Sequence, residues 1–128
     1  MTYLLDTHTF IWFLRSPGAL PIRVRELIED PASVLAVSLV TPWEMSIKCA
    51  IRRLDADDIL DDFESIVIRG NFQLLMPTVA HVIRSGRFPH FHRDPFDRLL
   101  AAQTLDLGWT LVSKDVVFDA YGVRRMWG

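Results

Sequence analysis

Short apolar runs alternate with segments of helical periodicity along the chain. The clearest run, residues 34–38, is continuous, as in a strand that a parallel sheet buries on both faces. Runs of similar length predict strands at residues 2–6, 72–76 and 110–113, and residues 123–125 are a candidate edge strand. The pattern therefore predicts a sheet of four to five strands.

The segments between these strands have the spacing of helices. We predict helices at residues 7–15, 21–30, 41–53, 58–69, 78–86, 95–107 and 115–120. The breakers at residues 16–18 (Ser-Pro-Gly) follow the first helix, and Gly108 ends the one before the last. Residues 88–93 are predicted to form a loop. Because strands alternate with helices, the expected class is α/β, with a mostly parallel central sheet covered on both faces.

The composition is that of one globular domain spanning residues 1–128. Half of the 128 residues are hydrophobic, 23% are charged, and the formal net charge is −2. This charge argues against broad electrostatic binding of nucleic acid, although a local basic rim beside an acidic pocket is compatible with it. Cys49 has no second cysteine with which to pair, and we find neither a secretory signal nor an apolar run of about 18 residues. We therefore expect a cytoplasmic protein with no membrane segment.

Four carboxylates occupy similar places in this pattern. Asp6 ends the first strand where a helix opens, and Asp115 follows the strand at residues 110–113 in the same way. Glu44 and Asp97 lie in or near the first turns of helices. Because the carboxyl ends of parallel strands lie on one edge of a sheet, folding is expected to bring the four acids together there.

Each of these acids also has a purely structural explanation. Asp6 and Asp115 are suited to cap the helices that follow them. Glu44 stands four residues before Lys48, the favourable orientation for an ion pair on a helix surface. The recurrence of acids at corresponding positions favours a shared site over separate roles.

A shared carboxylate site would need a cation, because clustered carboxylates repel one another and hold protons to an unusually high pH. Oxygen ligands suit Mg²⁺, with Mn²⁺ as the alternative. A single cysteine and few histidines near the strand ends argue against a zinc site. The glycine-rich motifs of nucleotide-cofactor folds are absent. Since Mg²⁺ shares phosphate oxygens, the implied reaction is metal-assisted hydrolysis of a phosphodiester.

Basic side chains gather in the segment around the third acid. They are Arg84, Arg87, His90, His92, Arg93 and Arg98. The segment is either a solvated loop or a rim that holds nucleic-acid phosphates while the acids hold the metal. Arg93 and Arg98 are the candidates for contact with substrate.

Two tryptophans bear on packing and on partners. Trp43 is expected in the core. In the helix predicted at residues 7–15, Phe10 and Phe13 share a face, whereas Trp12 points nearly opposite. The second apolar side needs a cover of its own, which is either a neighbouring helix or a partner protein.

Four blocks of the sequence resemble the PIN domain, and most of all the VapC-type toxins of bacterial toxin–antitoxin pairs. In order, they are residues 4–8 (Leu-Leu-Asp-Thr-His), residues 38–48 around Trp43-Glu44, residues 94–103 (Asp-Pro-Phe-Asp-Arg-Leu-Leu-Ala-Ala-Gln) and residues 111–115 (Leu-Val-Ser-Lys-Asp). The resemblance covers nearly the whole chain, and four blocks in order are far more specific than any one of them. It implies a three-layer α/β/α sandwich, a metal-dependent ribonuclease, a homodimer, and an antitoxin that blocks the site.

The resemblance also assigns individual residues. The catalytic and metal-binding acids of the family fall on Asp6, Glu44, Asp97 and Asp115. Asp94 competes with Asp97 for the third role, and we prefer Asp97 because the family's acid directly precedes an apolar helical run. Ser113 matches a hydroxyl position often near the site. Lys114 falls where the family varies and receives no role.

The leading hypothesis is a Mg²⁺-dependent endoribonuclease toxin of a toxin–antitoxin pair. A metal-dependent phosphatase or DNA nuclease would use the same acids, although aspartyl-phosphate chemistry needs an aspartate where His8 stands. A third hypothesis is a catalytically idle PIN-like module that only binds a partner. The presence of all four acids weighs against the idle module.

Overall fold

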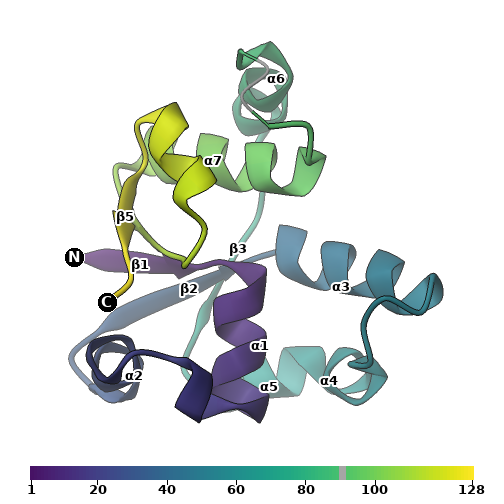
Figure 1. The fold of residues 1–128 in the computed structure, drawn as a ribbon, viewed down its shortest axis with the longest axis vertical. Coiled ribbons are helices and arrows are strands. Elements are labelled where there is room, and N and C mark those ends of the chain that lie inside the picture. The colour runs from purple at the N-terminus through teal and green to yellow at the C-terminus, as the bar shows by residue number, and fades with distance from the viewer. Residues whose placement is uncertain (90–91) are drawn as a thin grey trace.

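Parallel strands form the central sheet of the protein (Figure 1). The computed structural model describes residues 1–89 and 92–128. The strands are β1 (Thr2–Leu5), β2 (Val34–Ser38), β3 (Gln73–Leu75), β4 (Thr110–Val112) and β5 (Arg124–Met126). They lie in the order β3-β2-β1-β4-β5, and every neighbouring pair is parallel. The predicted parallel sheet is confirmed, and the candidate edge strand is its fifth member.

Helices cover both faces of this sheet. They are α1 (Thr7–Arg15), α2 (Ile22–Glu29), α3 (Val40–Ala50), α4 (Asp57–Asp61), α5 (Phe63–Arg69), α6 (Val79–Arg87) and α7 (Pro95–Leu107), with the 3₁₀ segments η1 (Pro17–Ala19) and η2 (Val116–Tyr121). Figure 1 shows α1, α2 and α5 on one side of the sheet and α7 with η2 on the other, while α6 packs against α7. The three-layer α/β/α sandwich is confirmed. In the part of the chain that is described, none of the helices combines the length and apolar character that crossing a membrane requires.

Alternate residues of the strands point into two separate cores. Leu5 faces the core that contains Phe10 of α1, whereas Leu4 and Leu111 face the core that contains Phe118 of η2. All five side chains are fully buried. Because β1 is covered on both faces, it needs apolar residues at successive positions, which explains its uninterrupted apolar run.

The helices depart from the sequence prediction in two places. The helix predicted at residues 41–53 ends at Ala50, because Arg52 adopts a left-handed conformation with φ of 59° that a helix cannot continue. The helix predicted at residues 58–69 is two helices, α4 and α5. They meet at Asp62, whose φ of −119° lies outside the helical range.

Smaller differences concern the end of the chain and one loop. The segment predicted as a helix at residues 115–120 is the 3₁₀ helix η2, and β5 lies one residue later than predicted. In the loop predicted at residues 88–93, residues 90–91 lie outside the described residues. The other residues of that loop belong to no helix or strand.

The sheet order fixes where functional side chains meet. β1 lies between β2 and β4, and Leu5 is in register with Val37 and Val112. The residues that follow, Asp6 after β1 and Ser113 after β4, therefore emerge side by side at one edge. Helices α1 and α3 begin at the same edge, because each directly follows its strand.

Candidate metal centre

Asp6 is held at the end of β1 by two hydrogen bonds. Its Oδ1 accepts from the amide of Thr9 at 3.0 Å, which caps α1, and its Oδ2 accepts from the hydroxyl of Ser113. Only 6% of Asp6 is exposed. Burial raises the pKa of Asp6, while the hydrogen bonds from Ser113 and Thr9 oppose the rise. Asp6 is therefore a helix cap and a buried acid at once, so its structural and functional explanations are compatible.

Glu44 is buried in the first turns of α3, and both of its carboxylate oxygens accept hydrogen bonds. Oε1 accepts from the hydroxyl of Thr7 at 2.8 Å, and Oε2 accepts from the ammonium of Lys48. Since only 3% of Glu44 is exposed, this ion pair is not on the helix surface. Burial opposes the charge of Lys48, but the hydrogen bond and charge of Glu44, followed by the charges of Asp94 and Asp97, raise the pKa of Lys48. Lys48 thus lies within electrostatic reach of three carboxylates.

Three side chains that could bind a metal converge at the start of α7. His92, Asp94 and Asp97 each offer one ligand atom, and these atoms lie within 4.8 Å of one another. Nε2 of His92 is 2.8 Å from Oδ2 of Asp97. Asp94 caps α7 by accepting from the amide of Phe96 at 2.9 Å. The two competing candidates for the third acid therefore belong to the same cluster.

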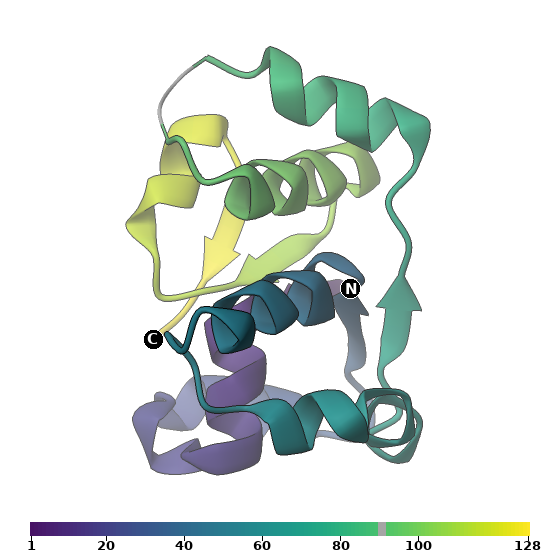
Figure 2. The same cartoon turned by 90° about the vertical axis from the view of Figure 1, so that its right-hand side faces the viewer.

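Electrostatics connect this cluster to the other acids. Burial is the main cause that raises the pKa of Asp97 to about 7; the charge of Asp94 comes next, and Glu44 and Asp6 add to it. The hydrogen bond from His92 acts in the opposite direction. Helix α3 packs against α7 (Figure 2), and Glu44 of α3 is near enough to Asp97 of α7 for its charge to raise the pKa of Asp97. The fold thus brings Asp6 and Glu44, which are far apart in the sequence, within electrostatic reach of Asp97 and its neighbour Asp94.

Asp115 lies on the Asp6 side of the site. Its Oδ1 accepts from the amide of Val117 at 3.0 Å and caps η2, and its own amide donates to Oγ of Ser113 at 3.0 Å. Ser113 therefore joins the loop of Asp115 to the carboxylate of Asp6. Asp115 is exposed, and with Asp6 it lines a cavity of about 420 Å³.

His92 is a candidate ligand that the sequence interpretation misses. The sequence pattern assigns it to the basic segment, whereas the structure places its imidazole against Asp97. The spacing His-x-Asp-x-x-Asp over residues 92–97 carries the signal, since a helix cap at Asp94 turns the chain and brings its neighbours together. Without the turn, the three residues would point in different directions.

Arg98 does not fit the prediction that it contacts substrate. It is buried, with 7% of its surface exposed, and it donates to the backbone carbonyls of Ser85 at 3.0 Å, Phe88 at 2.9 Å and His92 at 3.1 Å. A guanidinium carries five N–H groups in a rigid fork, which suits it to satisfy several loop carbonyls. Arg98 therefore holds the loop that carries His92.

The remaining basic residues differ in their surroundings. Arg84, Arg87 and Arg93 are exposed, as a rim for phosphates requires. The guanidinium of Arg84 lies 5.9 Å from the centre of the Phe88 ring. His90 lies outside the described residues.

Two tryptophans lie beside the acids. The prediction that Trp43 is a core residue is wrong, because 50% of it is exposed and it packs edge-on against Phe96 with ring centres 4.7 Å apart. Trp12 is half-buried between His8 and Trp127, at ring-centre distances of 5.8 and 5.9 Å. Part of the second apolar side of α1 is therefore covered by the C-terminal segment rather than by a neighbouring helix.

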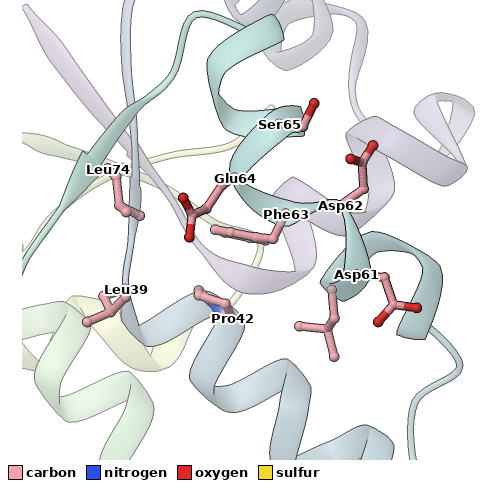
Figure 3. Close-up of a pocket in the computed structure, with 9 residues that line it drawn as sticks. Leu39, Pro42, Asp61, Asp62, Phe63, Glu64, Ser65 and Leu74 are labelled. Carbon is pink, nitrogen blue, oxygen red and sulfur yellow. The ribbon is translucent and has the colours of Figure 1, made fainter.

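A second cavity, of about 460 Å³, lies between the start of α3 and the α4–α5 junction (Figure 3). In Figure 3, Phe63 and Glu64 point towards Leu39 and Leu74, whereas Asp62 points away from them. Among the described residues, its lining shares no member with the acid cluster. The candidate chemistry therefore belongs to the edge of the sheet near Asp6 and not to this larger cavity.

Comparison with known proteins agrees with this geometry. The sequence matches the PIN domain family model over residues 3–123. The chain belongs to the PIN domain family. Ribonuclease VapC22 from Mycobacterium tuberculosis is 31% identical over 117 residues, a match that covers 89% of this chain and 87% of the relative. The resemblance to VapC-type PIN domains inferred from the four sequence blocks is confirmed.

Solved structures share the fold of this PIN domain. A chain of VapBC2 from Rickettsia felis, bound to a DNA fragment from their promoter, aligns with a TM-score of 0.74 and 14% identity over 100% of both chains. A chain of DNA-bound VapBC from Salmonella typhimurium aligns with a TM-score of 0.71 and 20% identity, covering 98% of this chain and 97% of that one. At these low identities the likeness shows the shared fold alone.

Proposed function

We propose that this PIN domain is a divalent-metal-dependent endoribonuclease toxin that hydrolyses RNA phosphodiester bonds. The observation that carries the proposal is the convergence of Asp6, Glu44, Asp94 and Asp97 with His92 at one edge of the sheet. Burial first, and then the charges of Asp94, Glu44 and Asp6, raise the pKa of Asp97 to about 7, which supports a site where a cation would stabilise the charged form.

The donor set fits a divalent cation. Asp94, Asp97 and His92 are close enough to share one ion, and Asp6 adds a buried carboxylate beside them. Carboxylate oxygens suit Mg²⁺ and Mn²⁺, and an imidazole among them makes Mn²⁺ a stronger alternative than an all-oxygen set would. When bound, the ion would polarise the phosphodiester and lower the pKa of an attacking water.

Other side chains of the protein hold the carboxylates in position. Thr7 and Lys48 fix both oxygens of Glu44, and Lys48 balances part of its charge. Ser113 holds the carboxylate of Asp6 and, through the amide of Asp115, the loop at the exposed side of the site. We propose that Asp6 and Asp97 contact the ion, as the sequence predicts, and that Asp94 and His92 are near enough to Asp97 to share it. Glu44 and Asp115, which the sequence also assigns to the ion, are proposed to lie behind Lys48 and at the mouth of the site.

Two observations support RNA as the substrate. The relative at 31% identity is named a ribonuclease. Arg84 and Arg87 are exposed on α6 and Arg93 is exposed just before α7, in the stretch of chain that leads into the acid cluster, and we propose that they bind phosphates of the RNA strand. A local basic rim of this kind is compatible with the net charge of −2.

We also propose an antitoxin and a second copy of the chain as partners in the cytoplasm. The solved structures that share the fold are named as VapBC complexes, which supports the antitoxin. An arginine of the antitoxin would pair with the acid cluster in place of the metal. Leu39, Trp43, Ile47 and Ile51 recur at every fourth position from the residue before α3 to the residue after it, and they are between 38% and 58% exposed, which supports an apolar face for the second copy. Sedimentation velocity on the purified protein distinguishes one copy from two.

The substrate class is tested by comparing three substrates in Mg²⁺. We expect cleavage of a single-stranded RNA, at least about a hundredfold slower cleavage of DNA of the same sequence, and no release of phosphate from a phosphomonoester. Comparable cleavage of DNA would support the DNA nuclease, and release from the monoester would support the phosphatase. A protein that processes none of the three while binding a partner would be the idle module.

A further inference from the structure

The cavity beside Asp6 is distinct in its chemistry from the carboxylate cluster that it adjoins. Its volume is about 420 Å³, and its lining is Asp6, His8, Trp12, Lys114, Asp115 and Val116. Asp6 belongs both to this lining and to the acid cluster, so a ligand in the cavity lies next to the proposed reaction centre. The other lining groups include an indole ring and a cation, which metal ligation does not use.

We propose that this cavity binds the nucleotide next to the cleaved phosphodiester, with its base against Trp12 and a phosphate at Lys114. The proposal rests on the ribonuclease function and specifies where the RNA strand runs across the site. It assigns roles to Trp12 and Lys114, neither of which belongs to the acid set.

The indole of Trp12 is held as a stacking surface. His8 lies 5.8 Å from it, and Trp127 lies 5.9 Å from it, both as ring-centre distances. The ring is half-buried, so it keeps an accessible surface while its neighbours restrict its motion. Aromatic side chains placed in this way stack bases without regard to sequence, because every base has a π-face.

Hydrogen bonds fix the residues on both sides of Lys114, Ser113 and Asp115. Ser113 donates to Asp6, the amide of Asp115 donates to Ser113, and a guanidinium N–H of Arg125 donates to the carbonyl of Ser113 at 3.2 Å. The backbone on which Lys114 stands is therefore held to the acid site, while its side chain is exposed. The sequence has two lysines, Lys48 and Lys114, and the structure places both beside the acids. A compact ammonium at this position suits a phosphate of the strand.

The competing occupant is a segment of the antitoxin, since Trp12 also offers an apolar surface to a protein. The lining favours RNA because it combines a ring, a cation and the acid proposed to act on the phosphodiester. The half-buried ring of Trp12 can take the base of a nucleotide, and the exposed ammonium of Lys114 can take its phosphate. A protein segment that docks on Trp12 through apolar contacts would leave the cation Lys114 without a partner.

The test measures RNA binding by fluorescence anisotropy in the presence of Mg²⁺, in an Asp97→Asn background that prevents cleavage. The probe is an oligonucleotide that the wild type cleaves. We expect Trp12→Ala to weaken binding about tenfold and Trp12→Phe to weaken it less, because phenylalanine keeps a ring. Lys114→Gln, at an exposed position that spares the fold, should weaken binding about threefold and reduce its salt dependence. The matched control is Arg124→Gln, an exposed cation at the start of β5 and thus at the opposite edge of the sheet, which should bind as the parent does.

Abasic substitutions in the oligonucleotide locate the subsite. Removing the base at one position next to the cleaved bond should weaken binding by the parent about as much as Trp12→Ala does, and it should have no further effect on Trp12→Ala. If the wild type cleaves RNA but Trp12→Ala and Lys114→Gln bind it as tightly as the Arg124→Gln control, the subsite is wrong and the ribonuclease function stands. Loss of antitoxin binding with unchanged RNA binding would assign the cavity to the protein partner. A wild type that neither binds nor cleaves RNA would overturn the function and the subsite together.

Discussion

Replacing Asp97 by asparagine is expected to lower the rate of RNA cleavage about a thousandfold and to leave the fold intact. Asn keeps the shape of the side chain but removes the charge that would hold the cation. The neighbouring His92 and the capping residue Asp94 remain in place, so α7 still begins where it does. Single-turnover cleavage of an RNA oligonucleotide measures the loss, and circular dichroism checks the fold.

The matched control is Asp57→Asn, an exposed acid at the start of α4, which should cleave at the wild-type rate. Asp94→Asn decides between the two candidates for the third acid. Asn caps helices about as well as Asp, so this substitution removes the charge without removing the cap of α7. If Asp97→Asn stays within a few-fold of the wild type while Asp94→Asn is inactive, Asp94 is the third acid.

Without metal, the protein is expected to be less stable at pH 8 than at pH 5. The pKa of Asp97 is about 7 in the fold, against an ordinary value of 3.8, so the folded state binds the proton more tightly than the unfolded state does. Stability therefore falls as the pH rises from about 4 to about 7, by at most about 4 kcal/mol for this group, and then levels off. Burial raises the pKa of Asp6 as well, which acts in the same direction.

Urea unfolding in EDTA at several pH values measures this dependence. Asp97→Asn should flatten it and should be more stable than the wild type at pH 8, because asparagine removes a buried charge and with it the repulsion from Asp94, Glu44 and Asp6. Adding Mg²⁺ at pH 8 should restore stability to the wild type and do much less for Asp97→Asn. A wild type whose stability in EDTA is equal at pH 5 and pH 8, or higher at pH 8, would contradict the raised pKa of Asp97.

Most of the prediction of where the acids lie comes from the pattern of the strands and from the residues at their ends. Asp6 follows a run that is apolar at successive positions, and such a run marks a strand buried on both faces. Once that strand is placed in a parallel sheet, the acids that follow strands or open helices must lie near one edge. The positions of Asp6, Glu44 and Asp97 could be predicted for this reason, without knowing any side-chain contact.

The sequence pattern does not predict the burial or contacts of a residue when these depend on segments far away in the chain. His92 lies against Asp97 because the buried Arg98 holds the loop, and nothing in local spacing distinguishes Arg98 from an exposed arginine. Lys48 follows Glu44 at the spacing of an ordinary surface pair, and only the packing of α3 against α1 and α7 shows that Glu44 is buried and Lys48 partly so. Trp43 is the converse case, a large apolar residue at the front of a helix that the fold leaves half exposed.

The break between α4 and α5 has a similar origin. Residues 58–69 carry apolar side chains at helical spacing on both sides of Asp62, so periodicity alone predicts one helix. Ile59 and Phe63 are both buried in the same core, but Asp62 between them has a φ of −119°, outside the helical range, so one helix ends and another begins there. Periodicity describes each helix but not the turn between them.

The most direct test of the central claim is cleavage before and after removal of metal. Wild-type protein is treated with EDTA, separated from it, and mixed with single-stranded RNA alone, with Mg²⁺, and with Mn²⁺. We predict no cleavage in the metal-free sample, full recovery with either ion, and no recovery for Asp97→Asn at any concentration of Mg²⁺ that restores the wild type. Undiminished cleavage by the metal-free wild type in the continued presence of EDTA would contradict a mechanism in which these acids act through a bound cation.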